Sequence, residues 1–153
     1  MIIDLAAVPK RTGSSYPQPF LDQVKGRIKQ RVGDAAGLKN FGVNWVILDP
    51  GSASALRHWH EQQDEFVYVV SGELTLITND GENLLTAGMM AGFPAGESNG
   101  HHLLNRSEQP AIYLEVGDRT FPDKVDYPDE DLQAVAENGT WQFQNKTGKP
   151  YDG

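Results

Sequence analysis

All four histidines of this 153-residue chain lie in two short segments, and both segments contain other residues that can bind a metal ion. In the first segment, residues 51–72, one residue separates His58 from His60, and Glu65 opens a run of strand-forming residues. Side chains on a β-strand alternate between faces, so His58 and His60 should point the same way. The polar turn before Glu65 lets its carboxylate return to that side. Two imidazoles and a carboxylate suit a divalent cation of intermediate softness.

The second segment, residues 88–105, supplies a further candidate ligand. Pro94 and Gly96 predict a tight turn, and strand-forming residues follow it. On that strand, His101 shares a face with Asn105, whereas His102 lies on the opposite face. Only one of the two adjacent histidines can therefore reach the same metal ion as His58 and His60.

These segments resemble the two motifs of the cupin superfamily, which are written G(X)5HXH(X)3–4E(X)6G and G(X)5PXG(X)2H(X)3N. The matching residues are Gly51, His58, His60, Glu65 and Gly72 in the first motif, and Gly88, Pro94, Gly96, His101 and Asn105 in the second. Two spacings differ, because six residues rather than five follow Gly51 and four rather than two follow Gly96. His101 keeps the family's three-residue spacing to Asn105. The resemblance covers roughly residues 40–118.

The resemblance implies an all-β fold, a single double-stranded β-helix also called a cupin or jelly-roll barrel. It implies one divalent transition metal per chain (Mn, Fe, Ni or Zn), held by His58, His60, Glu65 and His101. The wider pattern looks like that of small bacterial cupins labelled sugar-phosphate isomerases. N-terminal arms in this family often pack across a second subunit, so a homodimer is expected.

The hydrophobic pattern independently favours a barrel. Residues 41–49 alternate between an apolar and a mixed face, and residues 65–70, 73–78 and 111–116 form further short strand patterns separated by turn residues. Regularly spaced short strands without a helix-length amphipathic pattern predict a closed or nearly closed antiparallel barrel over residues 41–118. Length leaves room for one domain with one core.

The ends of the chain differ from the middle. Residues 1–40 are expected to form an arm that packs on the barrel or on a partner subunit, with one helical turn at residues 33–38 capped by Asp34. Residues 119–153 are expected to form a C-terminal extension, either a short helix at residues 130–136 or a tail. Trp141, Phe143 and Tyr151 could anchor this extension on the barrel.

Composition excludes several classes of protein. The net charge of −8 disfavours a general nucleic-acid binder, which needs a basic face. The chain has no cysteine, so disulfides, zinc–thiolate sites, iron–sulfur ligation and a catalytic thiol are excluded. No apolar run approaches about 18 residues and the first residues do not form a signal peptide, so we expect no membrane partner and a cytoplasmic protein.

The ligand chemistry predicts a metal-dependent enzyme that acts on a small carbonyl-bearing molecule, and the family label favours a sugar-phosphate isomerase. The alternatives are an Fe(II)-dependent dioxygenase, a non-catalytic small-molecule or metal-binding module, and a metal-free dimeric platform. A G-x-S-x-G match at residues 96–100 does not indicate a hydrolase, because strand residues follow it. Arg57 and Arg106 do not form a convincing phosphate clamp. The roles of Tyr68, Tyr113 and Glu115 stay unassigned, since alternation alone does not decide which of them face a cavity.

Overall fold

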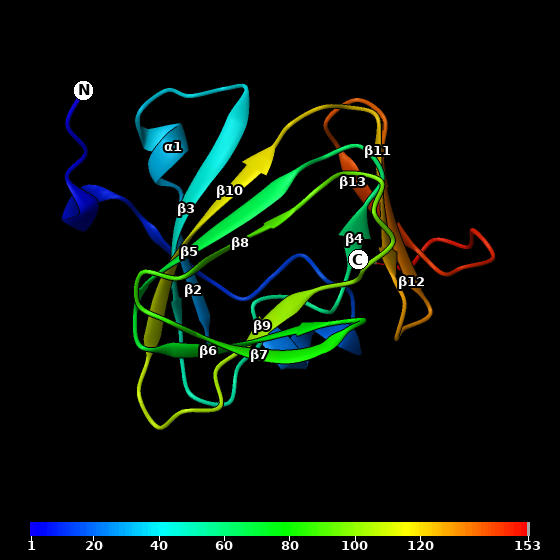
Figure 1. Ribbon diagram of the computed structural model, residues 1–153. Helices are drawn as coiled ribbons and strands as arrows, with labels where there is room; N and C mark the ends of the chain where they lie inside the picture. Colours follow the sequence, from blue (N-terminus) through cyan, green and yellow to red (C-terminus); the bar gives the residue numbers. More distant parts are fainter. Residues whose placement is uncertain (153) are drawn as a thin grey trace.

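Antiparallel strands dominate residues 1–152, the part of the chain that the computed structural model describes (Figure 1). The largest sheet contains, in order, β1 (Lys10–Thr12), β2 (Arg27–Gln30), β3 (Phe41–Leu48), β10 (Ala111–Asp118), β5 (Glu65–Ser71) and β8 (Met90–Phe93). A second sheet contains β13 (Trp141–Gln144), β12 (Leu132–Ala136), β11 (Asp123–Tyr127) and β4 (Trp59–His60). A third contains β7 (Gly81–Thr86), β6 (Glu73–Thr78) and β9 (His102–Leu104).

Helical structure is short and lies before β3. Within residues 1–152 it consists of two 3-10 turns, η1 (Leu5–Ala7) and η2 (Phe20–Val24), and the α-helix α1 (Val32–Ala35). The three sheets surround one interior (Figure 1), which confirms the predicted all-β barrel. The predicted strands at residues 41–49, 65–70, 73–78 and 111–116 correspond to β3, β5, β6 and β10.

Alternation explains how the wall is built. In β5, Val67 and Val69 are buried in the barrel, whereas Phe66 and Tyr68 point to the outer surface. A first core cluster fills the space between the largest and third sheets, with Leu48, Leu74 and Tyr113 among its fully buried members. A second core cluster is formed by side chains of β11 and β12 together with residues of η2 and of the segment before β4. Its members are Phe20, Leu56, Val125, Tyr127, Leu132 and Ala134.

The predicted helix at residues 130–136 is wrong. This segment forms β12, which pairs with β11 on one side and β13 on the other. Leu132, Ala134 and Ala136 are buried at every second position, which is the strand period, and tertiary pairing outweighs the helix propensity of leucine and alanine. The sheets therefore continue beyond residues 41–118 on both sides, through β2 and through β11–β13.

The predicted helical turn near residue 33 is present, but Asp34 does not cap it. The residue before the helix is Arg31, which makes no side-chain capping bond. Asp34 lies inside the helix, and its Oδ1 accepts a hydrogen bond from Arg119 Nη2 at 2.5 Å. Of the predicted aromatic anchors, Phe143 and Tyr151 pack against the second core cluster, whereas Trp141 is 36% exposed.

The outer face of the largest sheet is apolar, and we expect a second copy of the chain to cover it. Register aligns Trp45, Leu114, Tyr68 and Met90 in one row across four strands, and Met90 is 55% exposed. The first residues are also apolar and project from the barrel, since Ile2 is fully exposed (Figure 1). An exposed apolar face of this kind marks an interaction site.

Light scattering at micromolar concentration should therefore give the mass of a dimer. Changing Met90 to Lys should shift the mass toward that of a monomer, because the charge would be buried at the interface. Leu84 on β7 is a matched control, since it is 56% exposed but lies in another sheet, and Leu84→Lys should remain dimeric. A monomer mass for the unmodified protein would contradict the expectation.

Candidate metal centre

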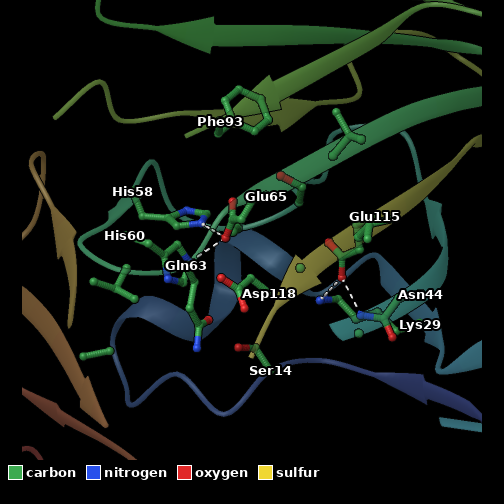
Figure 2. Close-up of a pocket in the computed structure, with 18 of the residues that line it drawn as sticks. Ser14, Lys29, Asn44, His58, His60, Gln63, Glu65, Phe93, Glu115 and Asp118 are labelled. Atoms are coloured by element: carbon green, nitrogen blue, oxygen red, sulfur yellow. Dashed lines mark hydrogen bonds and ion pairs between the residues drawn. The ribbon is translucent and has the colours of Figure 1, made fainter. Parts of the chain in front are cut away.

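The four predicted ligands come from separate elements that meet at one end of the barrel. His58 and His101 face each other in an isolated antiparallel bridge, His60 ends the short strand β4, and Glu65 is the first residue of β5. β4 is held in place by pairing with β11, where His60 lies opposite Val125. Figure 2 shows His58, His60 and Glu65 pointing toward one another.

Glu65 joins the three imidazoles. Its Oε1 lies 2.5 Å from His60 Nε2 and 3.2 Å from His58 Nε2, and its Oε2 lies 2.6 Å from His101 Nε2. The candidate ligand atoms of His58, His60 and Glu65 all lie within 4.8 Å of one another. The structure thus brings the four residues together, and metal binding by them stays a prediction.

His102 belongs to a different environment. One of its ring nitrogens, Nδ1, lies 2.8 Å from the backbone oxygen of Ala55, whereas His101 is bonded to Glu65 and is only 6% exposed. The two adjacent side chains therefore have separate partners, as strand alternation predicts. The longer turn after Gly96 therefore does not bring His102 to the cluster in place of His101.

The contacts of Nδ1 in His58 and His60 determine which nitrogen of each ring faces the cluster. His58 Nδ1 lies 2.7 Å from the backbone oxygen of Leu56, and His60 Nδ1 lies 2.6 Å from Asp123 Oδ2. Both contacts let Nδ1 donate its proton, so Nε2 is the nitrogen directed at the cluster. Nε2 donates to Glu65 while it is protonated and offers a lone pair once that proton is lost. The His101 ring stacks on Phe93 with 3.5 Å between ring centroids.

Asp123 is a supporting residue that sequence reasoning missed. Its side chain is buried, and its second oxygen, Oδ1, accepts a hydrogen bond from the backbone N–H of Gln62 at 2.9 Å. It is 63 positions from His60 in the sequence. No sequence motif contains both residues. The contact forms because β4 pairs with β11, which the sequence pattern did not predict.

The electrostatics of the cluster keep Glu65 ionised. Burial alone would raise the pKa of Glu65, but the charge of His58 and hydrogen bonds from the three histidines hold it well below its ordinary value. Burial lowers the pKa of His60, but the carboxylates of Asp123 and Glu65 outweigh this and raise it to about 9. The cluster thus presents one anionic and three imidazole ligands, a donor set that fits a divalent transition metal.

Changing Asp123 to Asn should weaken metal binding by roughly 10- to 100-fold, the usual cost of losing a residue that orients a ligand. The amide would keep the size of the side chain but lose the charge that orients His60. Calorimetric titration of Zn(II) into the chelator-treated protein measures the change. Asp126→Asn on the same strand is the control, and equal affinity for the two variants would contradict the role of Asp123.

A cavity of about 680 Å³ extends from the cluster across the barrel interior. At its other side, β2, β3 and β10 contribute Lys29, Asn44 and Glu115 (Figure 2). Glu115 Oε1 lies 2.6 Å from Lys29 Nζ and 2.9 Å from Asn44 Nδ2. Tyr113 and Glu115 both line the cavity, whereas Tyr68 lies on the outer row of the sheet.

Arg57 and Arg106 contact no part of the metal cluster. Arg57 binds Asp129 through Nε and Nη2, both at 2.8 Å. Arg106 pairs with Glu82 on the outer surface. The cationic side chains that line the cavity come instead from β2 and from the segments that follow β2 and β10. They are Arg27, Lys29, Arg31 and Arg119.

A family model described as a cupin domain matches residues 44–117. A cupin-superfamily sugar phosphate isomerase from Silicibacter pomeroyi is 42% identical, with 99% of this chain and 97% of that chain covered and a TM-score of 0.95. The chain belongs to the cupin superfamily. No curated protein matches this cupin.

Other solved cupins are more distant. A protein of Acidithiobacillus ferrooxidans, provisionally named a sugar phosphate isomerase, is 29% identical over 83% of this chain and 81% of its own, with a TM-score of 0.74. The polyketide cyclase RemF of Streptomyces resistomycificus is 18% identical over 77% of this cupin and 78% of its own chain, with a TM-score of 0.64, and shares the fold. Among residues 1–152, no helix is long and apolar enough to span a membrane.

Proposed function

We propose that this cupin is a metal-dependent isomerase of small sugar phosphates. The observation that carries the proposal is that one cavity holds both a cluster of candidate metal ligands and an ionised carboxylate outside that cluster. The 42% identity to a sugar phosphate isomerase supports the choice of substrate class. His58, His60, Glu65 and His101 would hold the metal, which when bound would act as a Lewis acid that stabilises negative charge on a substrate oxygen.

Glu115 is placed to move a proton. Register sets Glu65 opposite Gly117 and Glu115 opposite Val67, so the two carboxylates are diagonal neighbours on the inner face of the sheet. The backbone positions of such neighbours are about 7–8 Å apart, and both side chains line the same cavity. Burial alone would raise the pKa of Glu115, but Lys29 and Asn44 lower it below its ordinary value, so Glu115 is ionised and can accept a proton.

The step that this geometry suits is aldose–ketose exchange. Glu115 takes the proton from the hydroxyl-bearing carbon, the C–H electron pair forms the double bond of an enediolate, and the carbonyl electron pair moves onto its oxygen. Glu115 then returns the proton to the former carbonyl carbon, while the hydroxyl proton passes between the two oxygens. Atoms and charge balance without an oxidant, and the hydrogen moves between adjacent carbons.

The experiment is incubation of the metal-loaded protein with aldose and ketose phosphates in deuterium oxide without oxygen. Nuclear magnetic resonance should show interconversion with deuterium at the carbon beside the carbonyl. Glu115→Gln should retain the metal and lose at least about 100-fold in rate, the lower range of acid–base contributions. Oxygen consumption with Fe(II) alone would favour a dioxygenase. Binding of sugar phosphates without their interconversion or deuterium incorporation would favour a non-catalytic module.

A further inference from the structure

A second group in the cavity wall has no role in the proton transfer. Arg27 is the first residue of β2, lines the cavity and is only 8% exposed. Its Nη1 donates to the backbone oxygen of Ser54 at 2.5 Å and its Nη2 to that of Gly13 at 2.9 Å. Its Nε–H is buried and has no hydrogen-bond partner within residues 1–152.

Across the described part of the chain, no direct ion pair balances the charge of Arg27, although Glu115 lies within range of its field. Among the residues that the structure describes, no carboxylate lies within salt-bridge distance of its guanidinium. Glu115 is already paired with Lys29 at 2.6 Å. A buried cation without a directly bonded counter-ion is unfavourable, so the position suits a site that an anionic ligand completes.

Three tyrosines line the same cavity as this guanidinium, namely Tyr16, Tyr113 and Tyr127. Burial raises the pKa of each of them, and the positive charge of Arg27 opposes that rise, so all three lie within range of its field. The Tyr113 hydroxyl is buried and, within residues 1–152, makes no hydrogen bond of standard geometry, although the Ser54 side chain lies close enough to lower its pKa. Tyr127 also packs near the metal cluster, with its ring centroid 5.9 Å from that of His58.

We propose that Arg27 and the Tyr113 hydroxyl form the subsite for the phosphate group of the substrate. This inference deepens the proposed function and rests on it, since a sugar phosphate offers a carbonyl to one end of the cavity and a phosphate to the other. The guanidinium supplies charge and a planar fork of N–H donors, and the phenol supplies a neutral donor to a phosphate oxygen. In the register of the sheet, Glu115, held by Lys29, lies between the level of Glu65 and that of Arg27.

The test is calorimetric titration of inorganic phosphate into the metal-loaded protein, with urea unfolding as a check on folding. The unmodified protein should bind phosphate, Arg27→Gln should bind it at least about tenfold more weakly and Tyr113→Phe a few-fold more weakly, since about 1.4 kcal/mol corresponds to a factor of ten. Arg106→Gln is the matched control, because it removes the same charge from the outer surface. Its affinity for phosphate should not change.

If Arg27 only holds the backbone oxygens of Ser54 and Gly13, Arg27→Gln will lower the urea midpoint and the unmodified protein will not bind phosphate. Should Arg27→Gln fail to fold, the test rests on Tyr113→Phe and on Arg27→Lys, which conserves the charge but lacks the planar fork of donors. Each of these variants should bind phosphate more weakly than the unmodified protein. Phosphate affinity that is equal in the folded variants and the unmodified protein would overturn the subsite.

Failure of the subsite can be told apart from failure of the isomerase. Phosphate binding through Arg27 without conversion of any sugar phosphate would leave the subsite standing and contradict the activity. Conversion of unphosphorylated sugars by a protein that does not bind phosphate would leave an isomerase standing and overturn the subsite.

Discussion

Replacing His101 by Ala should remove most of the affinity of the protein for its divalent metal. His101 Nε2 lies 2.6 Å from Glu65 Oε2, and the ring is fixed between the metal cluster and Phe93. Loss of a direct ligand should exceed the roughly 10- to 100-fold cost of losing a residue that only orients one. Titration of Zn(II) or Mn(II) into chelator-treated protein, followed by calorimetry, measures the difference.

His102 provides the matched control for that experiment. It is the neighbouring histidine, but its Nδ1 contacts the backbone oxygen of Ala55. His102→Ala should keep the metal or lose at most about 100-fold in affinity. The reverse order of the two variants would show that His102, and not His101, completes the ligand set.

Metal content also affects stability. A ligand that binds only the folded state stabilises it by about 2.7 kcal/mol when present at a hundredfold excess over its dissociation constant. Chelation should therefore lower the thermal midpoint of the unmodified protein, and should have little effect on His101→Ala. Elemental analysis that finds no metal, together with no uptake on titration, would contradict the metal site itself.

The second large effect should come from the C-terminal strands. Leu132 on β12 is fully buried in the second core cluster, beside Leu56 and Val125. Leu132→Ala should reduce the free energy of unfolding by about 2–5 kcal/mol, the range for leucine deletion in a packed core. Urea unfolding measures it.

Gln133 on the same strand points to the opposite face, and Gln133→Ala should change the free energy of unfolding by no more than about 0.5 kcal/mol. Metal affinity should fall with Leu132→Ala as well, because β12 supports β11, which carries Asp123 beside His60. An unchanged urea midpoint for Leu132→Ala would mean that residues after 118 do not contribute to the core.

The central strands could be predicted from the sequence because they depend on local rules, and the candidate ligands were named by local rules together with the resemblance to the cupin motifs. Strand alternation places His58 and His60 on one side, and the same alternation separates His101 from His102. Turn residues separate the runs that become β5 and β6. Each of these inferences uses neighbours within a few positions, where backbone geometry restricts the possible arrangements.

What the sequence by itself determined is therefore the central strands of the barrel wall, while the resemblance to the cupin motifs named the residues that meet at the candidate metal centre. Only the tertiary structure decided that residues 132–136 are a strand, that Asp123 orients His60, and that Arg27 and Glu115 line the same cavity. The physical reason is that these contacts join segments far apart in the chain. Packing and strand pairing bring such segments together, and no local periodicity records which distant segment a side chain will face.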